Sequence, residues 1–433
     1  MNRRDALVGA SALGVSAVVG TRSAGAVESA AALLPRRVLL IDIDDIGHDL
    51  LNTAMASGGA PNLKRAFAVG RNYPTFWAAP NCSIFRARLL TGLDAYRTGN
   101  LVGRIVRAVD KTFDGPTGTW LPDGLPGRSV KVGKWHCSGA NSFPGRLITG
   151  GYEAFEGTRG NLNEGGSGYT DWTEWSADAS SSGSTPQSQF ATTRVAQRTL
   201  QEMEPESEFV HASFHAIHEP LEQPPDGEPQ GHIYSGTSDP ALRANMLFHL
   251  DHWLGVLLEA AWRRGYVAIV ACDNGSDGEG KGTHTEPGIR TPMVVLGRGV
   301  TPGTSTRLVQ ATDLWATVRR LRGDPAAATA ADSHDFSDDF LSVAPVAPPR
   351  DHLSVDWFPY LGVVPPASKW SRAVRDARWK YVDQKIPPNG ILLEPLIGLW
   401  DLLEDPDETV NLLDAPLDAA AAAALAQLLT YVP

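Results

Sequence analysis

Four short, mainly apolar runs, each followed at once by polar residues, dominate the pattern of the chain. The runs cover residues 38–41, 130–133, 209–214 and 267–270. A continuous run of this length is typical of a strand that is buried on both faces of a parallel sheet. Ligands of such sheets bind in the crevice beyond the carboxyl ends of the strands. We therefore expect the four polar clusters to meet at one site.

The first and last clusters are rich in oxygen ligands. Asp44 and Asp45 follow the first run, and Asp273 and Asn274 follow the last. An isolated Asp-Asp pair is more often a solvated turn after a strand. Two such pairs at two strand ends instead predict a divalent metal site. Carboxylates combined with an amide carbonyl favour Ca²⁺ or Mg²⁺ over Zn²⁺, whose sites want His or Cys.

The other clusters contain lysines and histidines. Lys134 and His136 follow the second run, His218 follows the third, and Lys281 lies shortly beyond the fourth. Taken singly, each is better interpreted as a surface lysine or a satisfied core histidine. Grouped opposite an anionic metal site, they predict clamps for an oxyanion, with the histidines able to move protons near neutral pH.

The N-terminal 26 residues have the composition of an export signal. Arg3 and Arg4 precede an apolar stretch from residue 6 to 20, and the small residues 24–26 offer a cleavage site. The stretch is too short and too rich in Gly and Ala for a membrane span, which favours cleavage over anchoring. The adjacent arginines indicate the twin-arginine route, with an ordinary secretory signal as the alternative.

Three later segments also differ from their surroundings. Residues 157–188 are rich in Gly and Ser without helical or strand periodicity, which predicts a long loop. The Ala- and Pro-rich residues 344–350 indicate a stiff connector, and we place a domain boundary there. An alanine run at 419–424, with Asp418 as N-cap, predicts a terminal helix.

Composition narrows the class of protein. With 42% apolar and 20% charged residues, a chain of 433 residues is globular and not disordered. The formal net charge of −11 argues against nucleic acid as a partner. Three cysteines exclude a disulfide framework and a Cys-rich zinc site, and we interpret Cys137 and Cys272 as buried small residues. His211 and His215, on the third strand, are interpreted as packing residues.

Longer motifs resemble those of the sulfatase family of the alkaline phosphatase superfamily, in the family's order and along nearly the whole chain after residue 26. Residues 40–45 are similar to the opening metal-binding strand, and residues 82–92 (C-S-I-F-R-A-R-L-L-T-G) to the signature C-x-P-x-R-A-x-L-L-T-G. Further matches are 60–63 (A-P-N-L), 133–136 (G-K-W-H), 216–220 (A-I-H-E-P), 272–275 (C-D-N-G), 281–292 and 399–412.

This resemblance implies a fold and a chemistry. The fold is α/β: an alkaline-phosphatase-like large mixed sheet sandwiched by helices over residues 36–343, and a smaller C-terminal antiparallel sheet plus helix over 351–433. One Ca²⁺ would be held by Asp44, Asp45, Asp273 and Asn274, with the group at Cys82 beside it. Cys82 would be oxidised to formylglycine, whose hydrate is the nucleophile.

The resemblance also implies roles for the remaining site residues. Arg86 would orient the formylglycine, while Lys134 and Lys281 would hold the sulfate oxygens. His218 would assist the leaving alcohol, and His136 would help a hydroxyl of the nucleophile to lose its proton. One position departs from the family pattern. Ile84 stands where the converting enzymes of the family expect Pro or Ala.

We therefore predict an exported, periplasmic or extracellular sulfuric ester hydrolase of arylsulfatase type that depends on Ca²⁺. Its partners would be a sulfate ester substrate, either a small molecule or a glycan, and a formylglycine-generating enzyme, with no nucleic acid and no stable membrane insertion. Two alternatives stay open. One is a phosphate mono- or diesterase on the same fold, against which Asn274 counts. The other is a catalytically silent anion- or glycan-binding protein with an unmodified Cys82.

Overall fold

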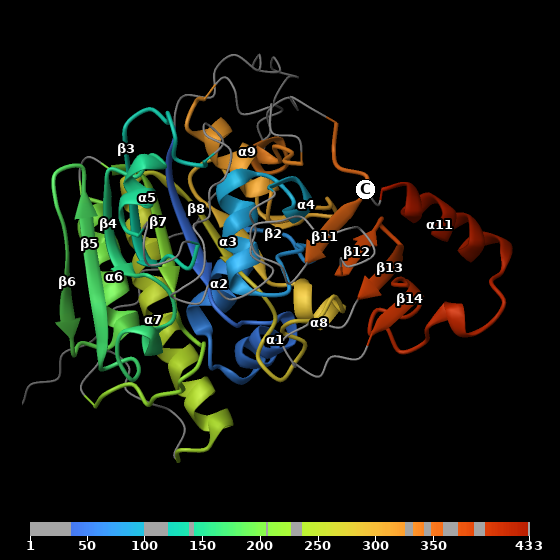
Figure 1. Ribbon diagram of the computed structural model, residues 1–433, viewed down its shortest axis with the longest axis horizontal. Helices are drawn as coiled ribbons and strands as arrows, with labels where there is room; N and C mark the ends of the chain where they lie inside the picture. Colours follow the sequence, from blue (N-terminus) through green and yellow to red (C-terminus); the bar gives the residue numbers. More distant parts are fainter. Residues whose placement is uncertain are drawn as a thin grey trace, which may run out of the picture.

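The four predicted strands lie side by side at the centre of a ten-stranded sheet in the computed structural model (Figure 1). They are β1 (Arg37–Ile43), β3 (Arg128–Lys134), β7 (Ser207–Phe214) and β8 (Tyr266–Cys272), and they pair in parallel in the order β8-β1-β7-β3. Their carboxyl ends therefore share one edge of the sheet, as the apolar runs predicted. The structure describes residues 36–98, 120–137, 143–204, 207–226, 236–324, 332–341, 348–357, 371–384 and 395–431.

Six further strands among the described residues extend the sheet on both sides. Beyond β3 lie β4 (Ala154–Thr158), β5 (Trp172–Asp178) and β6 (Ser182–Gln187), and beyond β8 lie β9 (Met293–Leu296), β2 (Arg71–Asn72) and β10 (Gly303–Thr304). Several of these pairs are antiparallel, including β4 with β5 and β8 with β9. The sheet is therefore mixed, as expected.

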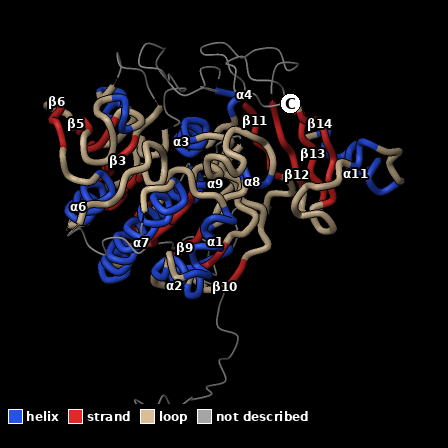
Figure 2. The backbone as a smooth tube through the Cα atoms, turned by 90° about the horizontal axis from the view of Figure 1, so that it is seen from below, coloured by secondary structure: helices blue, strands red, loops and turns tan. Residues whose placement is uncertain are grey.

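Two layers of helices cover the sheet, because its central strands are apolar on both faces. One face carries α3 (Cys82–Thr91), α4 (Ala95–Thr98), α5 (Gly145–Thr149), α9 (Asp313–Leu321) and α10 (Ser337–Leu341). The other carries α1 (His48–Ser57), α2 (Pro61–Val69), α6 (Ala191–Glu202) and α7 (Asp239–Arg264). Figure 2 shows α6 and α7 on the side of the strands opposite to α3. Alternate residues of β1 serve the two cores, with Leu40 in the first and Leu39 and Ile41 in the second.

The C-terminal region forms a second, antiparallel sheet. Its strands are β11 (Leu353–Trp357), β12 (Ser371–Arg375), β13 (Trp379–Gln384) and β14 (Leu396–Asp401), and α11 (Ala419–Thr430) packs against it (right in Figure 1). Asp418 accepts a hydrogen bond from the Ala421 amide at 2.8 Å, so the predicted N-cap is confirmed.

The two sheets meet in the hydrophobic cluster that α8 (Glu286–Ile289) shares with β11, β12 and β13. In this contact Lys380 of β13 is fully buried. Its Nζ lies 3.1 Å from Glu286 Oε1 and 2.6 Å from Glu408 Oε1, and 5.2 Å from the centroid of the Trp77 ring. A buried charge is therefore part of the junction.

The loop predicted for residues 157–188 is wrong in large part. The segment contains the 3₁₀ turn at Leu162–Glu164 and the hairpin of β5 and β6 at the edge of the sheet. β6 is exposed along most of its length, so its sequence S-G-S-T-P-Q has no apolar alternation from which a strand could be recognised.

Two predictions concern segments at or beyond the limits of the described residues. The export signal at 1–26 lies outside them, and so do residues 344–347 of the expected connector. Among the helices within the described ranges, none combines the length and the apolar character needed to cross a membrane.

Candidate active site and metal centre

The carboxyl ends of the central strands bring the predicted site residues together. In register, Ile43 of β1 faces Phe214 of β7 and Cys272 of β8. The residues after these positions therefore leave the sheet side by side. The Asp45 amide donates to Asp273 Oδ1 at 3.3 Å, which ties the first and last clusters together. Asp45 has a positive φ of 61°, a backbone turn that Asp tolerates better than most residues.

Carboxylates and cations alternate in the centre of the site. One ligand atom each of Asp44, Asp273 and Cys82 lies within 4.8 Å of the other two, and the same holds for Asp44, Asp45 and His218. Lys134 Nζ donates to Asp44 Oδ2, and Lys281 Nζ lies 2.6 Å from Asp45 Oδ1.

The electrostatics of the carboxylates favour a further cation. Burial raises the pKa of Asp273 well above its ordinary value, and the nearby negative charge of Asp44 raises it further. Burial also opposes ionisation of Asp44, but Lys134 and the other cations hold its pKa well below the ordinary value. A divalent cation among these groups would favour the ionised form of Asp273.

Unpartnered oxygen atoms show how a metal would fit. Asn274 Nδ2 donates to Asp45 Oδ1 at 2.7 Å and to the Gly275 carbonyl at 2.9 Å, which fixes the orientation of the amide. Asn274 Oδ1 and Asp44 Oδ1 are buried without a hydrogen-bond partner among the described residues. Buried oxygens of this kind require a partner, and three carboxylates with an amide oxygen form the donor set that Ca²⁺ or Mg²⁺ prefers. The residues therefore fit the expected ion.

Cys82 is the first residue of α3 and is 2% exposed. The preceding Asn81 caps the helix by accepting a hydrogen bond from the Ile84 amide. Cys82 Sγ lies 3.2 Å from His136 Nδ1 and 3.7 Å from Lys134 Nζ. Burial raises the pKa of the Cys82 thiol to about 12. An unmodified thiol here is thus a poor nucleophile at neutral pH, because the thiolate is the reactive form.

Arg86 enters the site one turn of α3 after Cys82. Its Nη1 lies 2.6 Å from Asp42 Oδ2 and donates to the Lys134 carbonyl at 3.1 Å. Its Nη2 lies 3.3 Å from Asp273 Oδ2 and 3.9 Å from Asp44 Oδ2. The guanidinium therefore sits between the sheet and the candidate metal ligands.

The position of Lys134 depends on the glycine before it. Gly133 has a φ of +88°, and a Cβ atom there would lie 2.0 Å from the Ser213 carbonyl oxygen of β7. Only glycine fits this close approach of two strands. Burial lowers the pKa of Lys134, but Asp44 together with the other nearby acidic groups raises it by more, so that the pKa lies above its ordinary value and Lys134 stays protonated.

Two histidines with an available nitrogen face the site. Burial, reinforced by the charge of Lys134, lowers the pKa of both His136 and His218 below 6.5, so that both are neutral at pH 7. His218 Nδ1 lies 2.6 Å from the Glu219 carbonyl, which can only accept, so Nδ1 carries the proton and Nε2 is a free base. Tyr169 fixes this segment by donating to the His218 carbonyl at 2.9 Å.

The two histidines interpreted as packing residues are buried, and both also form polar contacts. His215 Nε2 lies 2.7 Å from Thr158 Oγ1, and His211 Nε2 lies 2.6 Å from Asp42 Oδ1. The contact of Asp42 with Arg86 was not predicted from the sequence. A signal for it exists, since Asp42 is a charged residue at a strand position whose neighbours are core residues. Cys137 and Cys272 are buried free thiols, as interpreted.

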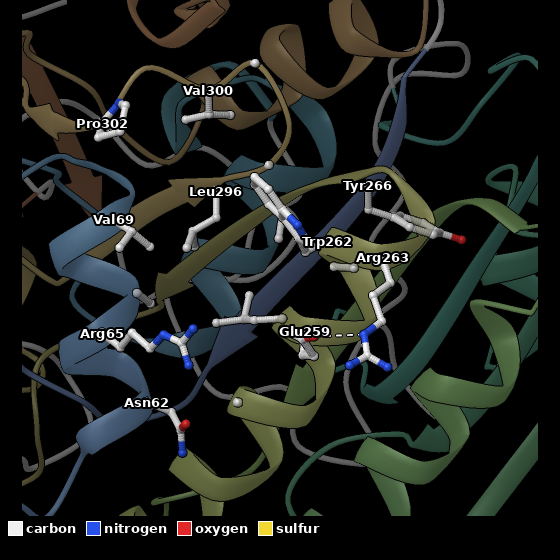
Figure 3. A pocket seen from close by; sticks show the side chains of 17 residues that line it. Asn62, Arg65, Val69, Glu259, Trp262, Arg263, Tyr266, Leu296, Val300 and Pro302 are labelled. Carbon is white, nitrogen blue, oxygen red and sulfur yellow. Dashed lines mark hydrogen bonds and ion pairs between the residues drawn. The ribbon is translucent and has the colours of Figure 1, made fainter. Parts of the chain in front are cut away.

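A wide groove lies away from this site, on the α2 and α7 face of the sheet (Figure 3). Its volume is about 720 Å³, and none of the predicted site residues lines it. Val69 and Trp262 are half-exposed in its wall, and Glu259 and Arg263 pair across 2.8 Å. This groove is therefore separate from the candidate active site.

The mixed sheet with its helical layers and the clustered carboxylates, lysines and histidines at the strand ends define a hydrolase of the alkaline phosphatase superfamily. The sequence profile described as Sulfatase matches residues 36–323, two thirds of the chain. The protein belongs to the sulfatase family, and it is a sulfuric ester hydrolase. A search of curated proteins found no match to the sequence.

Solved structures share the fold at low sequence identity. The PsFucS1 sulfatase from Pseudoalteromonas sp. superposes with a TM-score of 0.73 at 17% identity, covering 92% of this chain and 90% of its own. Ps i-CgsB in complex with k-i-k-neocarrahexaose gives 0.68 at 16% identity, covering 92% and 93%. BT4656, in complex with its substrate D-glucosamine-2-N,6-O-disulfate, gives 0.68 at 15% identity, covering 92% and 97%.

Proposed function

We propose that this protein hydrolyses sulfate esters with formylglycine, formed from Cys82, as the nucleophile and with one bound Ca²⁺. The observation that carries the proposal is the position of Cys82. Cys82 is the first residue of α3, and its sulfur lies within 4.8 Å of a carboxylate oxygen of Asp44 and of Asp273. Lys134 and His136 contact the same sulfur. A thiol with a raised pKa is a poor nucleophile at this position. The hydroxyl groups of a hydrated aldehyde would instead lie next to a metal, a base and a cation that can activate them.

The Ca²⁺ ligands are proposed to be Asp44, Asp45, Asp273 and Asn274, with the group at position 82 beside them. When bound, the ion would supply a Lewis acid for the sulfate oxygens. The two unpartnered oxygens of Asp44 and Asn274 support this assignment.

The lysines of the site bind the oxyanion in this proposal. Lys134 reaches it from β3, and Lys281 from the segment after β8. In the described structure both lysines contact carboxylates, so a cation at the carboxylates would release them for the substrate. Each then contributes one positive charge to oxygens whose charge grows in the transition state.

The histidines transfer protons. His136 Nδ1 is close enough to position 82 to accept a proton from a hydroxyl there, and the lowered pKa keeps the ring neutral for that purpose. His218 is proposed to assist departure of the alcohol through Nε2, the nitrogen not bonded to Glu219. Because Nε2 carries no proton in the neutral ring, it first takes one from solvent water and then gives it to the leaving oxygen. Arg86 orients the nucleophile through its Nη2 edge.

The substrate is proposed to be the sulfate ester of a small molecule or a saccharide. Ps i-CgsB and BT4656 were solved with an oligosaccharide and a sulfated amino sugar. These complexes support a sulfated saccharide. We also propose that residues 1–26 direct export to the periplasm or the exterior, and that a formylglycine-generating enzyme modifies the chain before it folds, because folding buries Cys82.

Peptide mass spectrometry over residue 82 tests the proposal. Protein made in a host with a competent converting enzyme should carry formylglycine there, and should turn over 4-nitrophenyl sulfate in the presence of Ca²⁺. The Cys82→Ala variant is the control, since it keeps the fold and cannot be converted. An unmodified thiol, with inactive protein, would instead favour the anion-binding alternative. Ile84→Pro, which restores the family pattern, should then raise conversion and activity together if Ile84 limits them.

A further inference from the structure

Four polar side chains lie together on the face of the sheet that α3 covers. They are Asp42 on β1, Lys131 on β3, and His211 and Ser213 on β7, and none is more than 2% exposed. Alternate residues of a strand share a face, and here that face also carries apolar core residues, among them Leu40 and Phe209. Four buried polar groups at apolar positions need hydrogen-bond partners and therefore a structural reason.

Asp42 is the centre of this cluster. In register it faces Ser213, whose Oγ donates to Asp42 Oδ1. His211 Nε2 lies 2.6 Å from the same oxygen. The Tyr152 hydroxyl lies 2.6 Å from His211 Nδ1, and by donating there it leaves the proton on Nε2, directed at Asp42. One carboxylate oxygen is thus held by two donors from β7.

The other carboxylate oxygen of Asp42 forms an ion pair with Arg86. Asp42 Oδ2 lies 2.6 Å from Arg86 Nη1, and the Lys134 carbonyl accepts from the same nitrogen at 3.1 Å. Because a guanidinium is planar and rigid, one ion pair and one hydrogen bond at Nη1 together restrict the direction of Nη2. Nη2 then points toward Asp273, 3.3 Å away, at the candidate metal site.

We propose that Asp42 is a positioning residue that acts on the active site through Arg86. It fixes the guanidinium, and it balances part of the positive charge that Arg86 also directs at Asp273 and Asp44, so that Arg86 competes less with a metal ion for those carboxylates. Those carboxylates stay available for the divalent cation. The inference rests on the proposed function, because it assigns Asp42 a part in keeping the same metal site and the same nucleophile in place.

The Asp42→Asn variant tests this, because it keeps the shape of the side chain and removes the charge. Ca²⁺ binding is measured by calorimetry on protein with an unmodified Cys82, so that conversion does not enter. We expect the Kd for Ca²⁺ to rise about 10- to 100-fold, the range seen when an outer partner of a metal site is removed. In converted protein at saturating Ca²⁺, kcat for 4-nitrophenyl sulfate should fall while KM changes by less than about two-fold.

An Arg86→Gln background shows whether Asp42 acts through Arg86. In this background Asp42→Asn should add no further loss of Ca²⁺ affinity, because the guanidinium charge that Asp42 balances is already absent. An equal loss in both backgrounds would overturn the proposal. If Asp42→Asn does not fold, Ser213→Ala removes one of the two donors and keeps the charge. It should shift the Kd in the same direction by less, and an unchanged Kd would also refute the idea.

Asp94→Asn is the matched control. Asp94 pairs with Arg88 of the same helix, Arg88 Nη2 lying 2.9 Å from Asp94 Oδ1, and both are buried outside the site. This variant should lose stability but keep the Kd and kcat of the parent. If it weakens Ca²⁺ binding as Asp42→Asn does, the effect is one of general stability and the inference fails. A parent protein that binds no Ca²⁺ would instead overturn the proposed function itself.

Discussion

The formal charge of the candidate site predicts a strong preference for sulfate over phosphate esters. At pH 8 both histidines are neutral, and Lys131, whose pKa burial lowers to about 7, is largely neutral as well. With a divalent ion bound, which favours ionised Asp273, the charged side chains are four carboxylates and three cations: Asp42, Asp44, Asp45, Asp273, Arg86, Lys134 and Lys281. One divalent ion leaves a single positive charge, which a sulfate monoester with its one negative charge would balance. A phosphate monoester dianion would add a negative charge without a partner.

The size of the penalty follows from the burial of the site. Two unit charges about 4 Å apart interact by about 4 kcal/mol at the effective dielectric constant of about 20 that describes protein sites. At about 1.4 kcal/mol per factor of ten, this amounts to about 10³-fold in kcat/KM. We therefore expect 4-nitrophenyl sulfate to exceed 4-nitrophenyl phosphate by about that factor.

The assay compares both esters with converted protein at one pH and one Ca²⁺ concentration, so that the leaving group is the same. Lys281→Met provides an internal check. It removes a positive charge next to Asp45 and should lower phosphate turnover more than sulfate turnover. Equal turnover of the two esters, or a preference for phosphate, would refute the charge argument and favour the phosphoesterase alternative.

Three further predictions address the metal, the oxyanion and the fold. Asp273→Ala should weaken Ca²⁺ binding by more than the roughly 100-fold that is typical when an outer partner of a metal site is removed. The variant should still unfold in a single cooperative transition. Stoichiometric zinc in a metal analysis of the parent protein would contradict the all-oxygen site. Lys281→Ala should lower kcat/KM for aryl sulfate by about 10²-fold, the scale for losing one oxyanion donor, and a change below about three-fold would show that Lys281 does not touch the substrate. Burial, together with the charge of Asp94, raises the pKa of Asp356 to about 7. The folded protein therefore holds this proton more tightly than the unfolded chain, and the stabilisation is complete below about pH 4 and lost as the pH rises through 7. Asp356→Asn should be more stable than the parent at pH 8 by a few kcal/mol and should lose this part of the pH dependence, as measured by urea unfolding at pH 5 and pH 8.

The central strands and their convergence could be predicted because both rest on local rules. A run such as Leu39–Ile41 is apolar on both faces, and parallel strands bring their carboxyl ends to one edge. The β5–β6 hairpin could not be predicted in the same way. β6 contacts solvent along most of its length, so no apolar residue marks its inward face. Its pairing with β5 alone makes it a strand.

The contact between Asp42 and Arg86 lies beyond sequence reasoning for a different reason. The two residues are 44 positions apart and belong to a strand and a helix whose packing only the folded chain determines. Asp42 could be recognised as a polar residue near the end of a strand, but its partner could not. His211 shows the same limit. Its burial was expected, whereas its bond to Asp42 depends on the register of β1 with β7.

The buried lysine at the junction of the two sheets has a consequence for how the chain can be divided. Lys380 supplies positive charge to both Glu286 and Glu408, and its ammonium group also lies over the ring of Trp77. A chain truncated before β13 would leave Glu286 without this lysine in what is now a protein interior, and it would uncover the indole ring. Glu286 would keep Arg290 and Arg375 as ion-pair partners, but removing one partner from a buried ion pair costs about 3–5 kcal/mol, comparable to the net stability of many domains. We therefore expect that the small sheet does not fold as an independent unit, and that the two sheets unfold in one cooperative transition.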